Sequence, residues 1–327
     1  MFCRTWKPAV YQGKYHMKGY FEGWYYKIAN KQEDMVGAFI PGVSFSPDGS
    51  DSHAFIQFLD NSGTYSNYFE YDLSEFWFSP DRPEVRIGKS FFSPSGIEVH
   101  IEANGTSIQG KLSFKDAKPW PVSLFSPGAM GWYAFVPFMQ CYHGVVNFDH
   151  MIEGSLHFNN KEIDFTGGRG YIEKDWGRSF PSYHIWIQTN HFEEPGSSLM
   201  VSVANVPWLG RYFDGFLIGL WHNNHLYKFA TYTGAKIVRF EYTRENLILH
   251  VKSRHHRLEV ETPYVKGASL KTPVQGNMQG RLSESLKGVI SVKLFDTANG
   301  QDSLLFSGHG RNAGMEIEGN IPQTLKL

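Results

Sequence analysis

The chain from Gly167 to Phe192 reads Gly-Gly-Arg-Gly-Tyr-Ile-Glu-Lys-Asp-Trp-Gly-Arg-Ser-Phe-Pro-Ser-Tyr-His-Ile-Trp-Ile-Gln-Thr-Asn-His-Phe. Within it, Tyr171, Glu173 and Asp175 follow one another at every second position, so on a β-strand their side chains point to the same face. After the proline, aromatic and polar residues alternate again, which is the pattern of a second strand. The stretch therefore reads as two strands separated by a turn that contains Gly and Pro.

Short strand patterns continue on both sides of this stretch. Residues 97–103 and 198–206 alternate in the same way, and residues 212–222 and 226–233 flank an Asn-Asn turn. No segment has the periodicity of a long helix. Many short strands with Gly- or Asn-containing turns predict an all-β fold of antiparallel sheets or barrels.

The composition limits the classes of function. The chain has 327 residues, a net charge of -1 and no long basic run, which argues against binding to nucleic acid. Aromatic residues make up 16% of the chain and charged residues only 19%, which indicates a large core or a cavity walled by rings. The first residues do not have the pattern of a secretory signal, and two cysteines do not form a disulfide framework. We therefore expect a cytoplasmic protein.

Carboxyl groups set among indole and phenol rings can stay protonated near neutral pH, because poor solvation disfavours the charged form. Tyr171, Glu173 and Asp175 are followed directly by Trp176, so the stretch has the ingredients of such an acid. The spacing of these residues fits a second interpretation equally well. In that interpretation the stretch is a turn followed by a strand, and Lys174 pairs with an acid at the surface. The spacing alone does not decide between the two interpretations.

A resemblance to the tocopherol cyclase family favours the functional interpretation. The segments Glu-Lys-Asp-Trp-Gly at 173–177, Phe-Pro at 180–181 and Trp-Ile-Gln-Thr-Asn at 186–190 resemble that family's Glu-Lys-Asn-Trp-Gly, Phe-Pro and Trp-Val-Gln-Cys-Asn. Phe-Glu-Gly-Trp-Tyr-Tyr-Lys at 21–27 resembles its opening motif, and similar order and spacing extend over nearly the whole chain. Asp175 departs from the pattern, because the family has Asn there.

The resemblance implies a fold of two lipocalin-like antiparallel β-barrels. Gly23-Trp24 on the first strong strand is also similar to the Gly-x-Trp with which lipocalins begin. We expect an N-terminal barrel over residues 1–145 and a C-terminal barrel over residues 146–327. An eight-stranded barrel is about wide enough to hold one small ligand.

The resemblance also implies the reaction, in which a phenol oxygen joins the tertiary carbon of a prenyl double bond to close a chromanol ring. Glu173 is the expected proton donor, with Tyr171 orienting it. Tyr171-Ile172-Glu173 is similar to the Tyr-x-Asp of a carotenoid-hydratase family, whose acid protonates an alkene and which also uses a His; here His143 takes that place. His143 fits a buried structural imidazole equally well, and Asp175 could instead orient Arg178 or cap a turn.

The expected substrate-binding residues supply rings that stabilise a carbocation, and polar groups that position the substrate. Glu22 could be a second acid in the cavity, or the partner of Arg169 or Lys27 in a core salt bridge. The full expected set is Glu22, Trp24, Trp176, Trp186, Gln188 and Asn190.

The leading hypothesis is thus a cyclase that needs no cofactor and no metal and acts on a prenylated phenol. Two alternatives remain open, a lipid or isoprenoid carrier without catalysis and an isoprenoid hydratase or isomerase. The expected partner is a hydrophobic small molecule, and a lipid substrate also allows for peripheral membrane contact during uptake.

Overall fold

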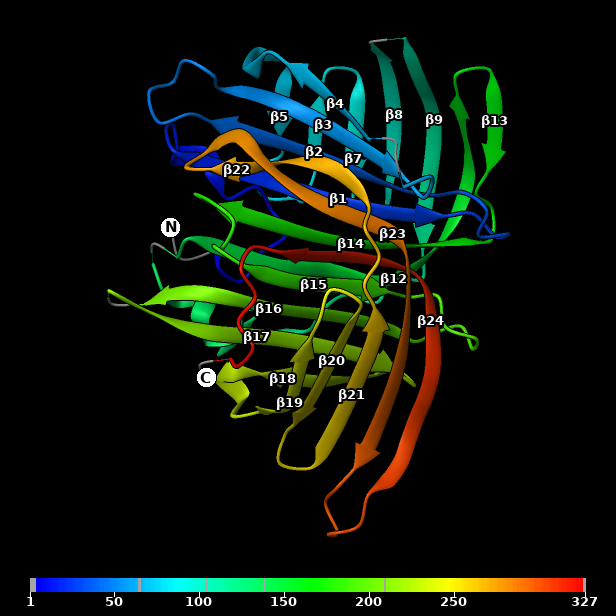
Figure 1. Ribbon diagram of the computed structural model, residues 1–327. Coiled ribbons are helices and arrows are strands. Elements are labelled where there is room, and N and C mark those ends of the chain that lie inside the picture. Colours follow the sequence, from blue (N-terminus) through cyan, green and yellow to red (C-terminus); the bar gives the residue numbers. More distant parts are fainter. Residues whose placement is uncertain (1–3, 64–65, 104, 138, 209, 326–327) are drawn as a thin grey trace. The chain divides into compact units, whose positions relative to one another are not determined.

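The computed structural model describes residues 4–63, 66–103, 105–137, 139–208 and 210–325 (Figure 1). The chain divides into two compact units. Unit 1 contains Met1–Phe180 and Leu270–Arg281, and unit 2 contains Pro181–Ser269 and Leu282–Leu327. No α-helix occurs in the part of the chain that the structure describes, and none of its helical turns is long and apolar enough to cross a membrane.

Unit 1 is built on one antiparallel sheet in the order β4-β3-β2-β1-β14-β12-β9-β8-β7-β6-β5, with β13 paired to β12. A separate two-stranded ribbon, β10 and β11, precedes the 3-10 helix η4. The strands are β1 Tyr20–Ala29, β2 Val36–Phe45, β3 His53–Asp60, β4 Ser66–Tyr71, β5 Phe76–Phe78, β6 Val85–Ile87, β7 Ser90–Ser93, β8 Gly96–Ala103, β9 Thr106–Lys115, β10 Val122–Ser123, β11 Ser126–Pro127, β12 Cys141–Phe158, β13 Lys161–Asp164 and β14 Gly168–Gly177. The short 3-10 helices are η2 Gly13–Tyr15, η3 Leu73–Glu75 and η4 Gly131–Phe135.

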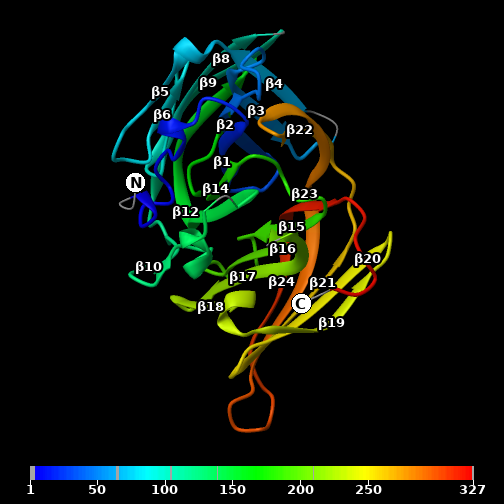
Figure 2. The ribbon, with the colours of Figure 1, turned by 90° about the vertical axis from the view of Figure 1, so that its left-hand side faces the viewer.

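The sheet of unit 1 curls round on itself, which brings β3 against β6 (Figure 2). Its inner face carries the hydrophobic core, to which β1 contributes Trp24, Tyr26 and Ile28 and β14 contributes Ile172. These residues lie at every second position, because successive strand residues point to opposite faces. The odd-numbered residues of β1 and β14 therefore point to the other face of the same sheet.

A later segment of the chain also belongs to unit 1. Leu270–Arg281 comprises most of β22, Ala268–Val274, and the start of β23, Asn277–Asp296. The Gln57 side chain donates to the carbonyl of Lys271 at 3.0 Å and accepts from its N–H at 2.9 Å. The Ser44 hydroxyl donates to the carbonyl of Gly276 at 2.5 Å. These bonds attach the segment to β2 and β3.

Unit 2 is built on a second antiparallel sheet in the order β18-β17-β16-β15-β24-β23-β21-β20-β19. Its core contains Ile185, Val201, Leu249 and Val292. Besides β23, its strands are β15 His184–Thr189, β16 Ser198–Trp208, β17 Arg211–His222, β18 His225–Ala230, β19 Lys236–Tyr242, β20 Asn246–Lys252, β21 His256–Pro263 and β24 Ser303–Glu318; the 3-10 helix η5 is Thr231–Thr233.

The prediction of an all-β protein with two lipocalin-like antiparallel barrel domains is confirmed. The expected boundary between residues 145 and 146 falls inside β12, whereas the compact units divide after Phe180. The difference has a physical reason. β14 pairs with both β1 and β12, so the stretch up to Gly177 completes the sheet of unit 1.

Candidate active site

The predicted acids meet His143 through the pairing of β12 with β14. In this antiparallel register His143 lies directly opposite Asp175, and Val145 lies opposite Glu173. His143 Nδ1 is 2.9 Å from Asp175 Oδ1, and His143 Nε2 is 3.8 Å from Glu173 Oε2. The three side chains offer ligand-type atoms that all lie within 4.8 Å of one another. One imidazole is thus placed between two carboxyl groups.

Tyr171 completes the group from the same strand. Its hydroxyl donates a hydrogen bond to Glu173 Oε2 at 2.7 Å. Tyr171 is fully buried and Glu173 is 4% exposed. Burial, and then the neighbouring Glu173, raise the pKa of Tyr171 well above its usual value, so the hydroxyl keeps its proton. The sequence-based prediction that Tyr171, Glu173 and Asp175 share one face agrees with this geometry.

The strand register separates the two tryptophans from Glu173. Trp24 lies directly opposite Lys174 in the β1–β14 pair, and Trp176 lies opposite Glu22. These four residues occupy the core side of the sheet, whereas Glu173 points to the other side. The Lys174 ammonium lies 5.0 Å from the Trp24 ring centroid and 4.6 Å from that of Trp176. Both indoles therefore face a resident cation on the side of the sheet away from Glu173.

Glu22 forms a buried ion pair with Lys174. Lys174 Nζ is 2.6 Å from Glu22 Oε1, and neither side chain has any exposed surface. Glu22 also accepts from the N–H groups of Gln12 and Gly13 and from the Tyr20 hydroxyl. Lys174 in turn donates to the carbonyls of Pro8 and Val10. The pair thus holds the N-terminal segment on the core of unit 1.

The expected alternatives for Glu22 and Lys174 need correction. The partner of Glu22 is Lys174, while Arg169 pairs with Asp149. Lys174 does not form a surface ion pair, because it points to the core side of the sheet, opposite to Glu173, and is fully buried there with Glu22. The sequence already contained this information. Lys174 lies between Glu173 and Asp175, so on an alternating strand it points to the opposite face.

Tyr25 is a residue that the sequence analysis did not single out. It lies directly opposite Glu173 in the β1–β14 register and is 8% exposed. Residues directly opposite one another in an antiparallel pair have Cβ atoms roughly 4.5–5.5 Å apart and point to the same side. Tyr25 is therefore the ring that β1 places on the Glu173 face. The sequence shows only that Tyr25 points away from its neighbour Trp24; its place opposite Glu173 follows from the β1–β14 register.

The other three expected binding residues belong to unit 2. Trp186 and Gln188 lie on β15, and Asn190 follows that strand directly. All three are buried. They form a group of their own on β15, and their part in binding a substrate stays a prediction.

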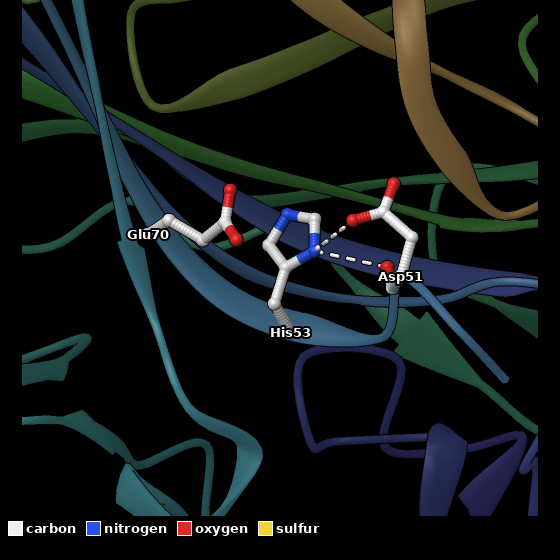
Figure 3. Close-up of side chains that lie close together, drawn as sticks. All are labelled: Asp51, His53 and Glu70. Atoms are coloured by element: carbon white, nitrogen blue, oxygen red, sulfur yellow. Dashed lines mark hydrogen bonds and ion pairs between the residues drawn. The ribbon is translucent and has the colours of Figure 1, made fainter.

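A second cluster of His and acids lies elsewhere in unit 1, at the start of β3. Figure 3 shows the His53 imidazole between the carboxyl groups of Asp51 and Glu70. Its Nδ1 is 3.0 Å from the carbonyl oxygen of Asp51, and its Nε2 is 2.5 Å from the Tyr68 hydroxyl. Burial, and then Glu70 and Asp51, raise the pKa of Tyr68, so its hydroxyl donates to Nε2. Hydrogen bonding at both nitrogens accounts for this cluster without a ligand.

Comparisons with known proteins agree with this fold and with the motifs. The model of a family described as tocopherol cyclase-like matches residues 95–319. The probable chloroplastic tocopherol cyclase of Oryza sativa subsp. japonica is 21% identical over 369 residues, which cover 93% of this chain and 77% of that protein. The chloroplastic tocopherol cyclase of Zea mays is 22% identical over 371 residues, with the same coverage. The word chloroplastic describes those relatives, and a cytoplasmic location stays a prediction for this chain.

Solved structures show the same fold at low sequence identity. CghA with Sch210972 superposes with a TM-score of 0.56 at 12% identity, covering 92% of this chain and 88% of that one. Kievitone hydratase from Nectria haematococca superposes with a TM-score of 0.51 at 10% identity, covering 95% and 94%. At such identities the likeness concerns the fold alone. The match of the family model over most of the length places this chain in the tocopherol cyclase-like family.

Proposed function

We propose that this protein is an acid-catalysed cyclase that converts a prenylated phenol into a chromanol. The observation that carries the proposal is the placement of His143 between Glu173 and Asp175 on one face of the β12–β14 pair. Membership in the tocopherol cyclase-like family supports the same reaction class. Ring closure of this kind is an isomerisation, so it requires a proton donor and a proton acceptor and no redox step.

Glu173 acts as the donor. Its carboxyl proton moves to the less substituted carbon of the prenyl double bond, and the tertiary carbon becomes cationic. The phenol oxygen then bonds to that carbon, and the phenol proton leaves to His143 Nε2. His143 lies 3.8 Å from Glu173 Oε2, so the proton returns to Glu173 and the cycle closes. No atom is gained or lost overall.

Two residues position these groups. Asp175 accepts the Nδ1–H of His143, which leaves Nε2 to take the phenol proton and favours the imidazolium that forms. Tyr171 donates its hydroxyl to Glu173 Oε2, the oxygen that also faces His143 Nε2, and so fixes the orientation of the carboxyl group. Tyr25, opposite Glu173, replaces Trp24 and Trp176 as the ring expected to stabilise the cation by cation–π attraction.

The same group of residues could also direct water onto the cation. A histidine oriented by a carboxylate can deprotonate water as well as a phenol, so an isoprenoid hydratase is the second candidate. A lipid carrier, the third possibility, uses the same buried surface without turnover.

Incubation of a prenylated hydroquinone with the protein in D₂O tests the proposal. Because the Glu173 carboxyl exchanges with solvent, cyclisation should give a chromanol with one non-exchangeable deuterium, next to the new ether carbon. A tertiary alcohol would establish the hydratase instead. Recovery of unchanged substrate that co-purifies with the protein would establish the carrier.

A further inference from the structure

A long uncharged stretch lies just before the candidate site. Between Pro119 and Phe148 the sequence contains no Asp, Glu, Lys or Arg. The stretch includes β10, β11 and η4, and it presents large apolar side chains to solvent. Their exposed fractions are 48% for Val122, 66% for Leu124, 81% for Phe125, 45% for Trp132 and 41% for Phe135. So many large exposed apolar side chains in one segment mark an interaction surface.

The N-terminal segment lies against this stretch. The Trp6 indole N–H donates to the carbonyl of Leu124 at 3.1 Å, and the Trp6 ring contacts Phe135 with centroids 5.4 Å apart. Pro8 packs beside Gly128 so closely that a Cβ at residue 128 would come within 3.0 Å of its Cγ. Together, residues 4–8 and the exposed residues of 122–135 form what we call the apolar-basic surface.

The charged residues within this surface are Arg4 and Lys7, and both are basic. Before Glu22 the chain contains no acidic residue, and it carries four basic ones: Arg4, Lys7, Lys14 and Lys18. Lys7, Lys14 and Lys18 are exposed. The exposed Tyr15 and Met17 lie among them. Exposed aromatic and aliphatic side chains beside basic residues match a bilayer, in which acyl chains lie beneath anionic headgroups.

We propose that the apolar-basic surface docks unit 1 onto an anionic lipid bilayer, with Leu124 and Phe125 entering the interface. Trp and Tyr are favoured at that depth because their rings are amphipathic. A protein partner of ordinary composition would bring carboxylates and hydrogen-bonding groups to a polar rim. Here only Arg4 and Lys7 could receive them, and the exposed apolar side chains between Val122 and Phe135 have no such partner to offer, which favours the bilayer.

The apolar stretch leads along the chain into β12, the strand that carries His143. The Tyr142 hydroxyl donates to the carbonyl of Val136 at 2.7 Å, which fixes the end of the apolar stretch. The Tyr142 ring stacks on Trp176 with centroids 5.4 Å apart on the core side of the sheet, and the next residue, His143, points to the other face. Delivery of a lipid substrate from the bilayer rests on the proposed function, whereas docking itself does not.

Vesicle flotation tests the docking. The probes are vesicles of phosphatidylcholine alone and of phosphatidylcholine with phosphatidylglycerol, without substrate. The full chain should float with the anionic vesicles, and added salt should weaken this binding. Leu124→Ser/Phe125→Ser should reduce the bound fraction at least about tenfold, because two large apolar side chains no longer enter the interface.

The matched control is Leu304→Ser/Leu305→Ser, which removes two exposed leucines from unit 2. It should float like the unchanged protein. Equal loss in both double variants, or flotation of Leu124→Ser/Phe125→Ser at the original level, would overturn the proposal. So would failure of the unchanged protein to float.

Two further measurements distinguish docking on a bilayer from self-association and from the proposed catalysis. Sedimentation equilibrium without lipid should show the same mass for the unchanged protein and for Leu124→Ser/Phe125→Ser; a dimer lost in the variant would instead identify a second copy as the occupant and overturn the proposal. Turnover of a detergent-dispersed prenylated hydroquinone should be equal in the two proteins. If neither shows turnover and the flotation result holds, the proposed function fails and the docking stands.

Discussion

His143 and Asp175 are direct partners in the β12–β14 register, and their side chains meet at 2.9 Å between Nδ1 and Oδ1. Backbone pairing and side-chain hydrogen bonding thus fix the same contact. Gly177, two residues on, sits so close to β12 that a Cβ there would lie 2.4 Å from the Gln140 carbonyl. The approach of the two strands is therefore tight where His143 is held.

The contact between His143 and Asp175 predicts that turnover depends on whether residue 175 can accept a hydrogen bond. Asp175→Asn keeps an oxygen that can accept the Nδ1–H, so turnover should fall by less than about tenfold. The acidic limb of the pH–rate profile should move to lower pH, because the imidazolium loses a neighbouring negative charge. Asp175→Leu removes the acceptor and should lower turnover more. Steady-state kinetics across the pH range checks this, and equal activities of the two variants would contradict it.

The hydroxyl of Tyr171 predicts a second, smaller effect. Tyr171→Phe removes only the hydrogen bond to Glu173 Oε2 at 2.7 Å. A hydrogen bond to a charged group contributes about 1.5–3 kcal/mol, and Glu173 becomes charged as it gives up its proton. Turnover should therefore fall roughly 10- to 150-fold, by less than on loss of the acid itself. Thermal unfolding serves as the control for folding. A Tyr171→Phe protein as inactive as a Glu173→Gln protein would assign the proton to Tyr171.

The Glu22–Lys174 pair predicts a pH dependence of stability. Burial outweighs the attraction of Glu22, and the pKa of Lys174 is lowered from 10.5 to about 8. Between these values the unfolded chain holds a proton that the folded protein has lost, so the free energy of unfolding rises with pH in this window. Below about pH 8 both states are protonated, and this dependence vanishes.

Urea unfolding of the unchanged protein and of Lys174→Met measures this effect. From about pH 7.5 to about pH 10.5 the stability of the unchanged protein should rise relative to the variant by up to about 3 kcal/mol. At neutral pH the variant should be less stable, since breaking a buried pair costs about 3–5 kcal/mol. A parallel pH dependence in both proteins would show that Lys174 titrates as it does in the unfolded chain.

Removal of metal ions should leave turnover unchanged. Alkene protonation by a carboxylic acid needs no Lewis acid, and Asp175 already holds Nδ1 of His143. Dialysis against EDTA followed by assay in metal-free buffer checks this. Loss of activity that returns on addition of zinc would reassign His143, Glu173 and Asp175 as ligands.

Local alternation predicted much of the site. Tyr171, Glu173 and Asp175 share a face because β14 pairs with β1 as a regular strand, so period two applies from end to end. The same rule places Lys174 and Trp176 on the opposite face. The prediction grouped Trp24 and Trp176 with Glu173 because all three belong to the family motifs. In a strand, however, neighbouring residues point to opposite faces.

Contacts between distant strands could not be predicted in this way. The partner of Glu22 depends on the register of β1 against β14, which joins residues far apart in the chain. The role of Tyr25 opposite Glu173 depends on the same register. The unit boundary was likewise hidden, because β14 follows β12 in the chain yet also pairs with β1. Such registers are set by tertiary packing rather than by local pattern.

Turnover of a prenylated hydroquinone by Glu173→Gln shows whether Glu173 donates the proton. The amide keeps the shape and the contact with Tyr171 but has no acidic proton, so turnover should fall 10²–10⁴-fold or more, as is typical for loss of a positioned acid. Substrate binding and thermal unfolding should change little. Glu70→Gln is the matched control, the same substitution beside a histidine of unit 1, and it should keep full activity. Full turnover by Glu173→Gln would show that Glu173 is not the proton donor.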